Sequence, residues 1–408
     1  MTGWRPAPRT EAALAAIAAA EADRSEHPER YALDVDHVAA VAARDGDTSD
    51  FSPGWREGLE QYLGSANEDG RLHAFGIANT FRTAVGRLRA GAAMTRYRAE
   101  QLGGEAPGPA APPIVITGGW RTGTTFLFRL LASDPRLRAP LPAELAAPTR
   151  VAALSEPERE RLIGASGAAH DVLHALNPEL RSIHDSGARL PEECGLAMGT
   201  DLRNWAFTST TRLDTYAAWL AQHDLADQYA AYRGALGALD RGDGRRWVLK
   251  APPHLAELPA LVAAFPGAVV VVLHRDIVET ISSGASLFAV FRSMYSAEVD
   301  PVDVGRFQCD QTEVWLRRAQ QFRATRRSSA STLVDLEYTD LVADPTEAIA
   351  RVYDAAGMDP PPDPDAFVAD YDAAHPRHAH GAHRYTAADF GLDEREVRER
   401  FAPFEPVG

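Results

Sequence analysis

Cysteine is rare in this chain, and long apolar runs are missing from it. Its 408 residues include two cysteines, Cys194 and Cys309, which stand too far apart to indicate a disulfide framework or a metal cluster. This usage fits a reducing compartment, so we expect a cytoplasmic protein. No apolar run approaches the roughly 20 residues that span a membrane, and the alanine-rich residues 1–20 are broken by charges, so we expect no targeting segment.

Lysine is almost absent as well. Of the 42 lysine and arginine residues, only Lys250 is a lysine. Such a bias commonly reflects genome composition, and against it one retained lysine suggests that a compact ammonium group is needed at that position. Retention by chance would give the same pattern.

The charge balance is acidic, with a formal net charge of -15 at pH 7. Nucleic acids and anionic membranes bind basic surfaces, so we expect neither as a partner. Any anionic ligand must therefore meet a local positive pocket. The composition is otherwise that of an ordinary globular protein, with 45% hydrophobic and 24% charged residues, and the length allows one large domain with additions or two domains.

The chain is organised around residues 113–135, whose sequence is PIVITGGWRTGTTFLFRLLASDP. A short β-branched run, Ile114–Ile116, predicts a buried parallel strand. Glycines follow it, and apolar residues then recur at helical spacing from Phe126 to Leu131. This order predicts a strand, a tight turn and a helix whose N-terminal amides attract an anion.

The turn has the spacing of a nucleotide-binding P-loop, G-x-x-x-x-G-K-[ST], from Gly118 to Thr125. Thr124 replaces the lysine that would reach a γ-phosphate, while Arg121 inside the loop supplies a planar cation. This pattern favours a terminal anionic group of smaller charge than a phosphate. A strand–turn–helix junction without a ligand is the alternative.

The segment WRTGTTFLFRLLASDPRLRAP resembles the 5′-phosphosulfate loop of sulfotransferases that use 3′-phosphoadenosine-5′-phosphosulfate (PAPS), especially their bacterial small-molecule branch. Family members usually carry a proline before the basic residue, where this chain has Trp120. The resemblance implies that PAPS contacts the residues of the loop, which are Gly119, Trp120, Arg121, Thr122, Gly123, Thr124 and Thr125.

A second segment alternates between strand and helix patterns. Trp247–Leu249 and Ala268–Leu273 predict two parallel strands, and a helix over Leu255–Phe265 connects them. Asp276 and Glu279 form a D-x-x-E capping box that predicts the start of the next helix. Such alternation predicts a doubly wound parallel sheet with its ligand at the carboxyl ends of the strands.

Arg275 stands at the end of the second of these strands, and Ser283 follows eight positions later, about two helical turns on. The resemblance implies that both bind the 3′-phosphate of PAPS. A surface arginine and an ordinary helix serine are the alternatives. The late segment GAHRY resembles the part of bacterial relatives that closes over the nucleotide, which implies a phosphate contact for Arg384.

Four residues are candidates for the chemistry of transfer. Lys250 and Arg121 would offset the charge that builds on the leaving oxygen. His254 follows Lys250 in a K-x-x-x-H pattern that resembles the family's Lys-Thr-His element, and its neutral imidazole suits a general base. Glu144 is the rival base, because some branches of the family place a glutamate at a similar distance after the loop. A carboxylate at a helix start is the alternative for Glu144. The LPEEC motif, residues 190–194, resembles a Pro-Glu-Glu element and implies a place in the acceptor pocket.

We therefore expect an α/β fold, a P-loop-like parallel sheet flanked by helices. Residues 1–105 form a helical N-terminal region, and a connector rich in proline and glycine follows it. Residues 112–360 form the α/β core, with a helical insertion at 155–240 that we expect to wall the acceptor pocket. Residues 361–408 form a tail that we expect to close over the cofactor.

The tail contains four histidines, namely His375, His378, His380 and His383. No cysteine or acidic residue stands at ligand spacing beside them, so we expect no bound metal. A loop over the cofactor is the preferred interpretation.

The function that the resemblance implies is transfer of the sulfuryl group of PAPS to a hydroxyl or amine of a small-molecule acceptor by in-line displacement. An NTP-dependent small-molecule kinase is one alternative, and it ought to have the loop lysine that Thr124 replaces. A non-catalytic nucleotide-binding protein is the other. The sequence specifies neither the acceptor nor the oligomeric state.

Overall fold

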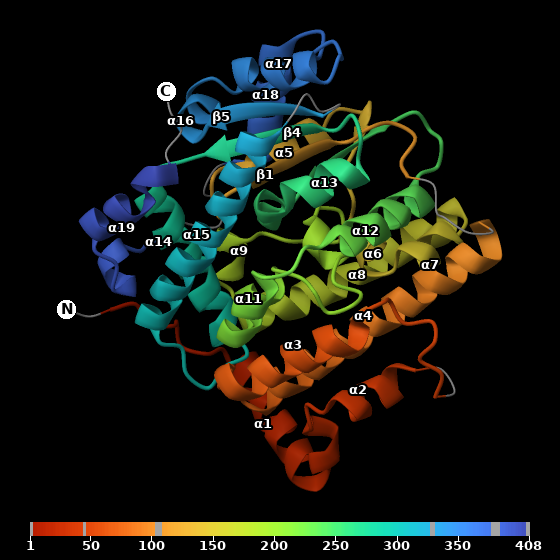
Figure 1. Cartoon of the computed structure of the whole chain (residues 1–408), viewed down its shortest axis with the longest axis vertical. Coiled ribbons are helices and arrows are strands. Elements are labelled where there is room, and N and C mark those ends of the chain that lie inside the picture. The colour runs from red at the N-terminus through yellow and green to blue at the C-terminus, as the bar shows by residue number, and fades with distance from the viewer. Residues whose placement is uncertain (1–2, 44–45, 103–107, 327–330, 377–383, 405–408) are drawn as a thin grey trace.

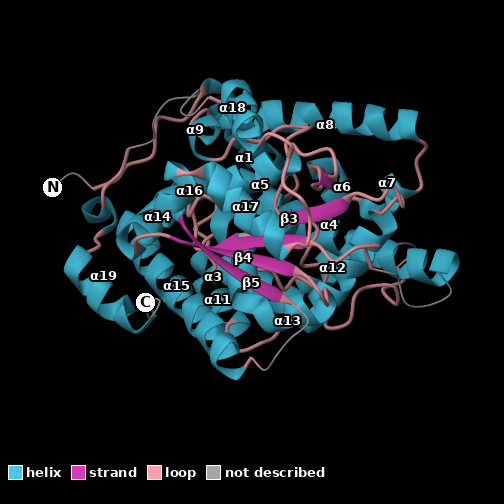
Figure 2. Cartoon of the chain, turned by 90° about the horizontal axis from the view of Figure 1, so that it is seen from above, coloured by secondary structure: helices cyan, strands magenta, loops and turns pink. Residues whose placement is uncertain are grey.

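The computed structural model describes residues 3–43, 46–102, 108–326, 331–376 and 384–404. Within these ranges, parallel strands form a sheet in the order β2-β3-β1-β4-β5 (Figures 1 and 2). The strands are β1 (Ile114–Gly118), β2 (Leu137–Arg138), β3 (Arg246–Lys250), β4 (Val269–His274) and β5 (Thr332–Glu337). The α/β fold with a parallel sheet flanked by helices is thereby confirmed.

The predicted strands correspond to β1, β3 and β4, although β4 begins at Val269, one residue later than predicted. The chain adds a two-residue edge strand, β2, that is too short to carry a sequence pattern. The middle of the sheet is β1, where Ile114 pairs with Val248 of β3 and with Val269 of β4. Both neighbours are parallel to β1. Every residue of β1 is buried, as are the first five residues of β4, so both strands are covered on both faces. Strands that are covered in this way have largely apolar sequences without alternation.

The two faces of the sheet contact different sets of helices. Val115 and Val270 belong to a core that includes Leu88 from the N-terminal region. Ile116 and Val271 belong to a second core on the opposite face. In Figure 1, α17 and α18 lie above the strands and the N-terminal helices lie at the far lower end of the molecule.

The N-terminal region is helical, as predicted. Its elements are α1 (Glu11–Glu26), η1 (Pro28–Tyr31), α2 (Val35–Ala42), α3 (Trp55–Asp69), α4 (Ala74–Tyr97) and η2 (Arg98–Leu102). The loop helix α5 (Thr124–Ala132) then packs against the sheet and contributes Leu127 and Leu131 to the second core.

The insertion is helical at both ends and irregular in its middle. It contains α8 (Glu156–Leu176), α9 (Leu180–Ile183), η3 (Cys194–Leu196), α10 (Phe207–Thr210), α11 (Asp214–Leu220) and α12 (Ala226–Leu239), and the short helices α6 (Pro142–Ala146) and α7 (Pro148–Ala152) precede it. The long helix α8 runs through Gly164 and Gly167 without a break. A Cβ at Gly164 would meet nothing within 4 Å, so the helix passes here without tertiary constraint.

The C-terminal half returns to the sheet twice and ends in helices. Its elements are η4 (Pro252–Glu257), α13 (Leu258–Ala264), α14 (Ile277–Ser293), α15 (Pro301–Thr325), α16 (Tyr338–Ala343), α17 (Pro345–Ala355), α18 (Pro364–Ala374), η5 (Ala387–Phe390), α19 (Glu394–Phe401) and η6 (Ala402–Phe404). Residues 298–310 carry no clear period, yet most of them are helical. Asp300 caps α15 by accepting from the Val302 amide, and Pro301 suits the first helical position.

Candidate active site

The loop between β1 and α5 is shaped by residues with unusual backbone conformations. Gly123, the N-cap of α5, has a φ of 88°, and a Cβ there would meet the Tyr338 ring at 2.9 Å. A Cβ on Gly118 would lie 2.5 Å from the carbonyl oxygen of Leu273. Arg121 has a φ of 63° without being glycine, a conformation that costs on the order of 1–2 kcal/mol. The chain therefore turns tightly at the start of α5, where the first helical amides have no partner within the helix.

Two arginines meet at this loop from different parts of the chain. The Nη1 atom of Arg275, at the end of β4, donates to the carbonyl oxygen of Arg121 over 2.9 Å. Arg275 also pairs with Glu279 over 2.8 Å, and its guanidinium lies 4.4 Å from the centre of the Tyr338 ring. The Arg121 side chain donates to the carbonyl oxygen of Ile183 over 2.6 Å. The structure thus places positive charge along the loop and ties the loop to the insertion.

Lys250 comes to the same place from the end of β3. Its ammonium group donates to the hydroxyl of Thr125, in the first turn of α5, over 3.1 Å. It also forms an ion pair with Glu193, and it lies 5.9 Å from the centre of the Phe128 ring. The lysine residue is only 2% exposed. The compact cation is therefore held at the helix start, where Thr124 has replaced the P-loop lysine.

Glu192 and Glu193 of the LPEEC motif supply the acids of this site. Glu193 pairs with Lys250, and the Nε2 atom of His184 lies 3.6 Å from a carboxylate oxygen of Glu192. Burial acts to raise the pKa of Glu192, but the charges of His184 and Lys250 outweigh it and lower that pKa to about 2. The motif was placed in the acceptor pocket by resemblance alone. The sequence does not predict the contact of His184 with Glu192, because a single histidine in an irregular segment carries no pattern.

His254 is buried behind Lys250, with 0% of the residue exposed. Its Nδ1 atom lies 2.6 Å from the hydroxyl oxygen of Tyr229, while Nε2 has no hydrogen-bond partner among the described residues. Burial, together with the charge of Lys250, lowers the pKa of His254 to about 3. A ring with so low a pKa is a poor general base near neutral pH, and a fully buried residue is out of reach of an acceptor, so both observations disfavour the base role expected for His254.

Glu144 lies in a buried network of ion pairs. Its carboxylate accepts from the Leu141 amide over 2.8 Å and from Arg138 over 3.3 Å, and it pairs with Arg159. Glu144 is 1% exposed. By accepting from the Leu141 amide, the carboxylate stabilises the first turn of α6. This is the helix-start role that the sequence left open as the alternative. The structure therefore argues against Glu144 as the base.

Several expected cofactor contacts have side chains that face the protein. The Trp120 indole donates to the Gln311 side chain over 3.3 Å, and its ring lies 5.1 Å from that of Phe288. Thr122 donates its hydroxyl hydrogen to the Gly119 carbonyl over 2.9 Å. These hydrogen bonds tie both side chains to the protein and stabilise the loop.

The remaining expected contacts are spread around the loop. Thr124 is 3% exposed and Ser283 of α14 is also buried. Arg384 is exposed, close to the start of the final described range. His375 contacts the Tyr371 carbonyl over 3.0 Å, whereas His378, His380 and His383 lie outside the described residues. No group of three metal-ligating side chains occurs in the described part of the chain.

A groove of about 740 Å³ begins at the loop. It is lined by Gly119, Thr122 and Arg275 at one end and by Trp315 and Phe401 further along. Arg398 of α19 also lines it and pairs with Asp276, the N-cap of α14, over 2.6 Å. The C-terminal helices therefore form part of the groove that leads away from the loop.

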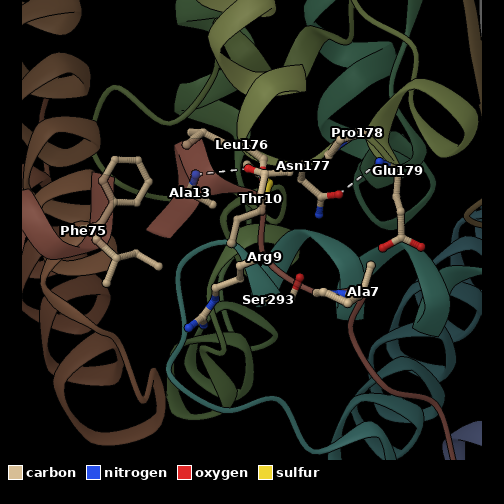
Figure 3. A pocket seen from close by; sticks show the side chains of 13 residues that line it. Ala7, Arg9, Thr10, Ala13, Phe75, Leu176, Asn177, Pro178, Glu179 and Ser293 are labelled. Atoms are coloured by element: carbon tan, nitrogen blue, oxygen red, sulfur yellow. Dashed lines mark hydrogen bonds between the residues drawn. The ribbon is translucent and has the colours of Figure 1, made fainter. Parts of the chain in front are cut away.

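A second, smaller cavity of about 170 Å³ lies beside the N-terminal segment (Figure 3). Arg9, Thr10, Phe75, Asn177 and Glu179 line it. It contains no residue expected to bind PAPS. Among the helices that the structure describes, none is both long and apolar enough to pass through a lipid bilayer.

Comparison with known proteins agrees with this geometry. The model of the sulfotransferase family matches residues 112–362. The solved sulfotransferase STF1 from Mycobacterium tuberculosis H37Rv is 27% identical, with a TM-score of 0.74 and coverage of 91% of this chain and 98% of that chain. The sulfotransferase STF9 from Mycobacterium avium has the same fold, at 23% identity and a TM-score of 0.77. The match covers 90% of this chain and 95% of that chain. Among curated proteins none matches. Because the family match spans more than half of the sequence, this chain belongs to the sulfotransferase family.

Proposed function

We propose that this sulfotransferase uses PAPS as the donor and a small molecule with a hydroxyl or amine as the acceptor. The observation that carries the proposal is the meeting of Arg121, Lys250 and Arg275 at the loop before α5, with no lysine at the P-loop position. Such a site offers cations and backbone amides to an anion without the group that reaches a γ-phosphate. We place the enzyme in the cytoplasm, in keeping with its two free, buried cysteines.

The residues present fit PAPS at both of its charged ends. The 5′-phosphosulfate would lie against the loop from Gly119 to Thr125, with Lys250 and Arg121 beside it. The 3′-phosphate would meet Arg275 and Ser283. Arg384 would add a phosphate contact, as the resemblance of its segment implies. The groove of about 740 Å³, which begins at the loop and Arg275, offers room for the adenosine.

Bound PAPS supplies a sulfur atom that the acceptor oxygen or nitrogen attacks in line, while the bond from sulfur to the bridging oxygen breaks and its electron pair stays on the 5′-phosphate. The chain's part is to hold these groups in place and to balance charge. Lys250, at the start of α5, stabilises the negative charge on the departing oxygen. Arg121 and the loop amides do the same for the group in transfer.

The acceptor loses a proton in this step, and we propose Glu193 as the group that takes it. Its carboxylate contacts the ammonium of Lys250, and 20% of its side chain is exposed, so an acceptor can reach it. Glu144 and His254 are each at most 1% exposed. Its contact with Lys250 and its exposure support Glu193 in the role that the sequence gave to those two residues.

The proposal is tested by ligand-induced thermal shifts. Adenosine 3′,5′-bisphosphate should raise the melting temperature without Mg²⁺, and ATP and GTP should raise it less, because a ligand that binds the native state stabilises it by mass action. Radiolabelled PAPS with a panel of phenols, alcohols and amines then tests transfer. A preference for ATP or a requirement for Mg²⁺ would support the kinase alternative instead. Tight nucleotide binding with no sulfated product from any acceptor would support a non-catalytic protein.

A further inference from the structure

The N-terminal segment, residues 3–10, contacts the C-terminal part of the chain across almost the whole length of the sequence. It contains no helix or strand, and in Figure 1 it passes beneath the dark blue C-terminal helices. The amide of Trp4 donates to the carbonyl oxygen of Asp389, in η5, over 3.2 Å. The ring centres of Trp4 and Phe390 lie 6.2 Å apart, and Phe390 is fully buried. Trp4 therefore packs on η5 and donates a hydrogen bond to it.

The other end of the segment is fixed by side-chain contacts. The Arg9 guanidinium donates to the Ser296 carbonyl oxygen over 2.8 Å, and the Thr10 hydroxyl donates to the Ala175 carbonyl oxygen over 2.8 Å. Arg9 and Thr10 also line the small cavity of Figure 3. The segment is therefore attached to the end of α8 and to the residues after α14, so its course toward η5 is set.

The helix that Trp4 contacts belongs to one side of the large groove. Ala387 of η5 shares a small hydrophobic core with Val397 and Phe401 of α19 and with Ile281 of α14. Phe401 also lines the groove of about 740 Å³ that begins at the loop and Arg275. We call η5 and α19 together the C-terminal wall. Because the two helices share a core, a shift of η5 would disturb the packing of α19 against the groove.

Surface ion pairs add little to the hold on the C-terminal wall. Arg398 of α19 pairs with Asp276 over 2.6 Å, but the two side chains are 50% and 34% exposed, and water screens pairs of this kind. An aromatic ring that packs on a buried ring removes much more apolar surface from water. The contact of Trp4 with Phe390 therefore contributes more to the position of the wall than this ion pair does.

We propose that Trp4 is a positioning residue for the nucleotide: it holds η5, and through η5 it keeps α19 where that helix lines the groove. The inference rests on the proposed function, which places the adenosine of PAPS in this groove. Trp4 is not among the residues that line the groove, so it acts through the C-terminal wall. If the wall occupies its binding position in only a fraction of the molecules, the apparent Kd rises in inverse proportion to that fraction.

Calorimetric titration with adenosine 3′,5′-bisphosphate tests this role. We expect Trp4→Ala to raise the Kd about 3- to 10-fold, as the loss of one aromatic contact implies, and Trp4→Phe, which keeps a ring on Phe390, to restore most of the affinity. Trp55→Ala is a matched control, because Trp55 also packs on a buried phenylalanine, Phe51, with ring centres 5.1 Å apart, and does not line the groove. Both alanine variants should lose stability, but only Trp4→Ala should lose affinity. An unchanged Kd in Trp4→Ala, or an equal rise in Trp55→Ala, would overturn the inference.

Hydrogen exchange measured by mass spectrometry shows whether the C-terminal wall responds. In the protein without nucleotide, Trp4→Ala should speed the exchange of amides in residues 387–401 and leave those of β1 unchanged, because a segment that loses a contact opens more often on its own. Trp55→Ala should leave residues 387–401 as in the wild type. Equal exchange of this peptide in Trp4→Ala and in the wild type would contradict the role of Trp4, even if the Kd rose.

The failure of this inference can be told from failure of the proposed function. A wild-type protein that binds adenosine 3′,5′-bisphosphate, with no change of affinity in Trp4→Ala, would refute the positioning role alone. A wild-type protein that binds no adenosine 3′,5′-bisphosphate and consumes no PAPS would refute the proposed function and this role with it.

Discussion

Arg275→Ala would remove a guanidinium that joins the end of β4 to the loop between β1 and α5. The side chain donates to the Arg121 carbonyl over 2.9 Å and lies 4.4 Å from the centre of the Tyr338 ring. It is 19% exposed, so a ligand can reach a cation that is already held in place. We therefore expect the substitution to weaken binding of the 3′-phosphate more than it changes the fold.

The size of the loss follows from the kind of contact. A charge-assisted bond to a phosphate in a partly buried site is worth roughly 2 to 4 kcal/mol. This corresponds to a rise in the Kd for adenosine 3′,5′-bisphosphate of about 30- to 700-fold. In the free protein Arg275 also pairs with Glu279, whose side chain is 57% exposed. That exposed pair contributes at most about 1 kcal/mol, so competition from it does not reverse the effect.

Isothermal titration calorimetry with adenosine 3′,5′-bisphosphate measures this loss. Arg395→Ala is a matched control, because Arg395 and Glu399 form an i,i+4 pair of the same kind and the Arg395 side chain is 77% exposed. The control should bind the nucleotide as the wild type does. An unchanged Kd in Arg275→Ala would refute the assignment of the 3′-phosphate to this arginine. A comparable rise in both variants would instead point to a general effect of lost positive charge.

Three further outcomes are expected. Lys250→Ala should lower kcat more than it raises the Kd for adenosine 3′,5′-bisphosphate, because the ammonium stabilises charge that develops only during transfer; equal losses would assign it to ground-state binding. Glu144→Gln should lower stability by roughly 3 to 5 kcal/mol in urea unfolding, since Arg138 and Arg159 lose a buried partner. Its folded fraction should keep its turnover, and a stable but inactive variant would restore Glu144 as the base. The pKa of Glu192 is about 2 in the folded protein against an ordinary 4.5, so its contribution to stability is present above pH 4.5 and is lost as the pH falls toward 2. Glu192→Gln should therefore lose less stability than the wild type between pH 6 and pH 3, and parallel losses would contradict the shift.

The sequence by itself determined the sheet and the loop, because both depend on local physical requirements. Unbroken β-branched runs fit strands that are covered on both faces, as Ile114–Ile116 and the run before His274 are. Gly123 marks a left-handed turn that other residues adopt at a cost. Asp276 caps α14 as predicted, although the Glu279 carboxylate pairs with Arg275 and leaves the capping box half formed.

Helix extent was less predictable where burial hides the period. Residues 298–310 show no amphipathic pattern, yet most of them lie in α15. In that stretch the polar Gln308 is 0% exposed and the apolar Val302 is 56% exposed, so burial does not follow side-chain polarity. A helix whose polar and apolar residues are distributed in this way does not show the hydrophobic period of an ordinary surface helix. Its existence therefore depended on contacts that only the folded chain provides.

Tertiary structure alone decided what each candidate residue can do. Lys250 meets Glu193 across 57 positions of sequence, Arg121 meets Ile183 across 62, and the contact of Tyr229 with His254 spans 25. No local pattern encodes these meetings, because they arise when the insertion folds back over the carboxyl ends of the strands. The sequence could name His254 as a histidine near a lysine. Only its burial against Tyr229 lowers the pKa of the ring and puts it out of reach of an acceptor.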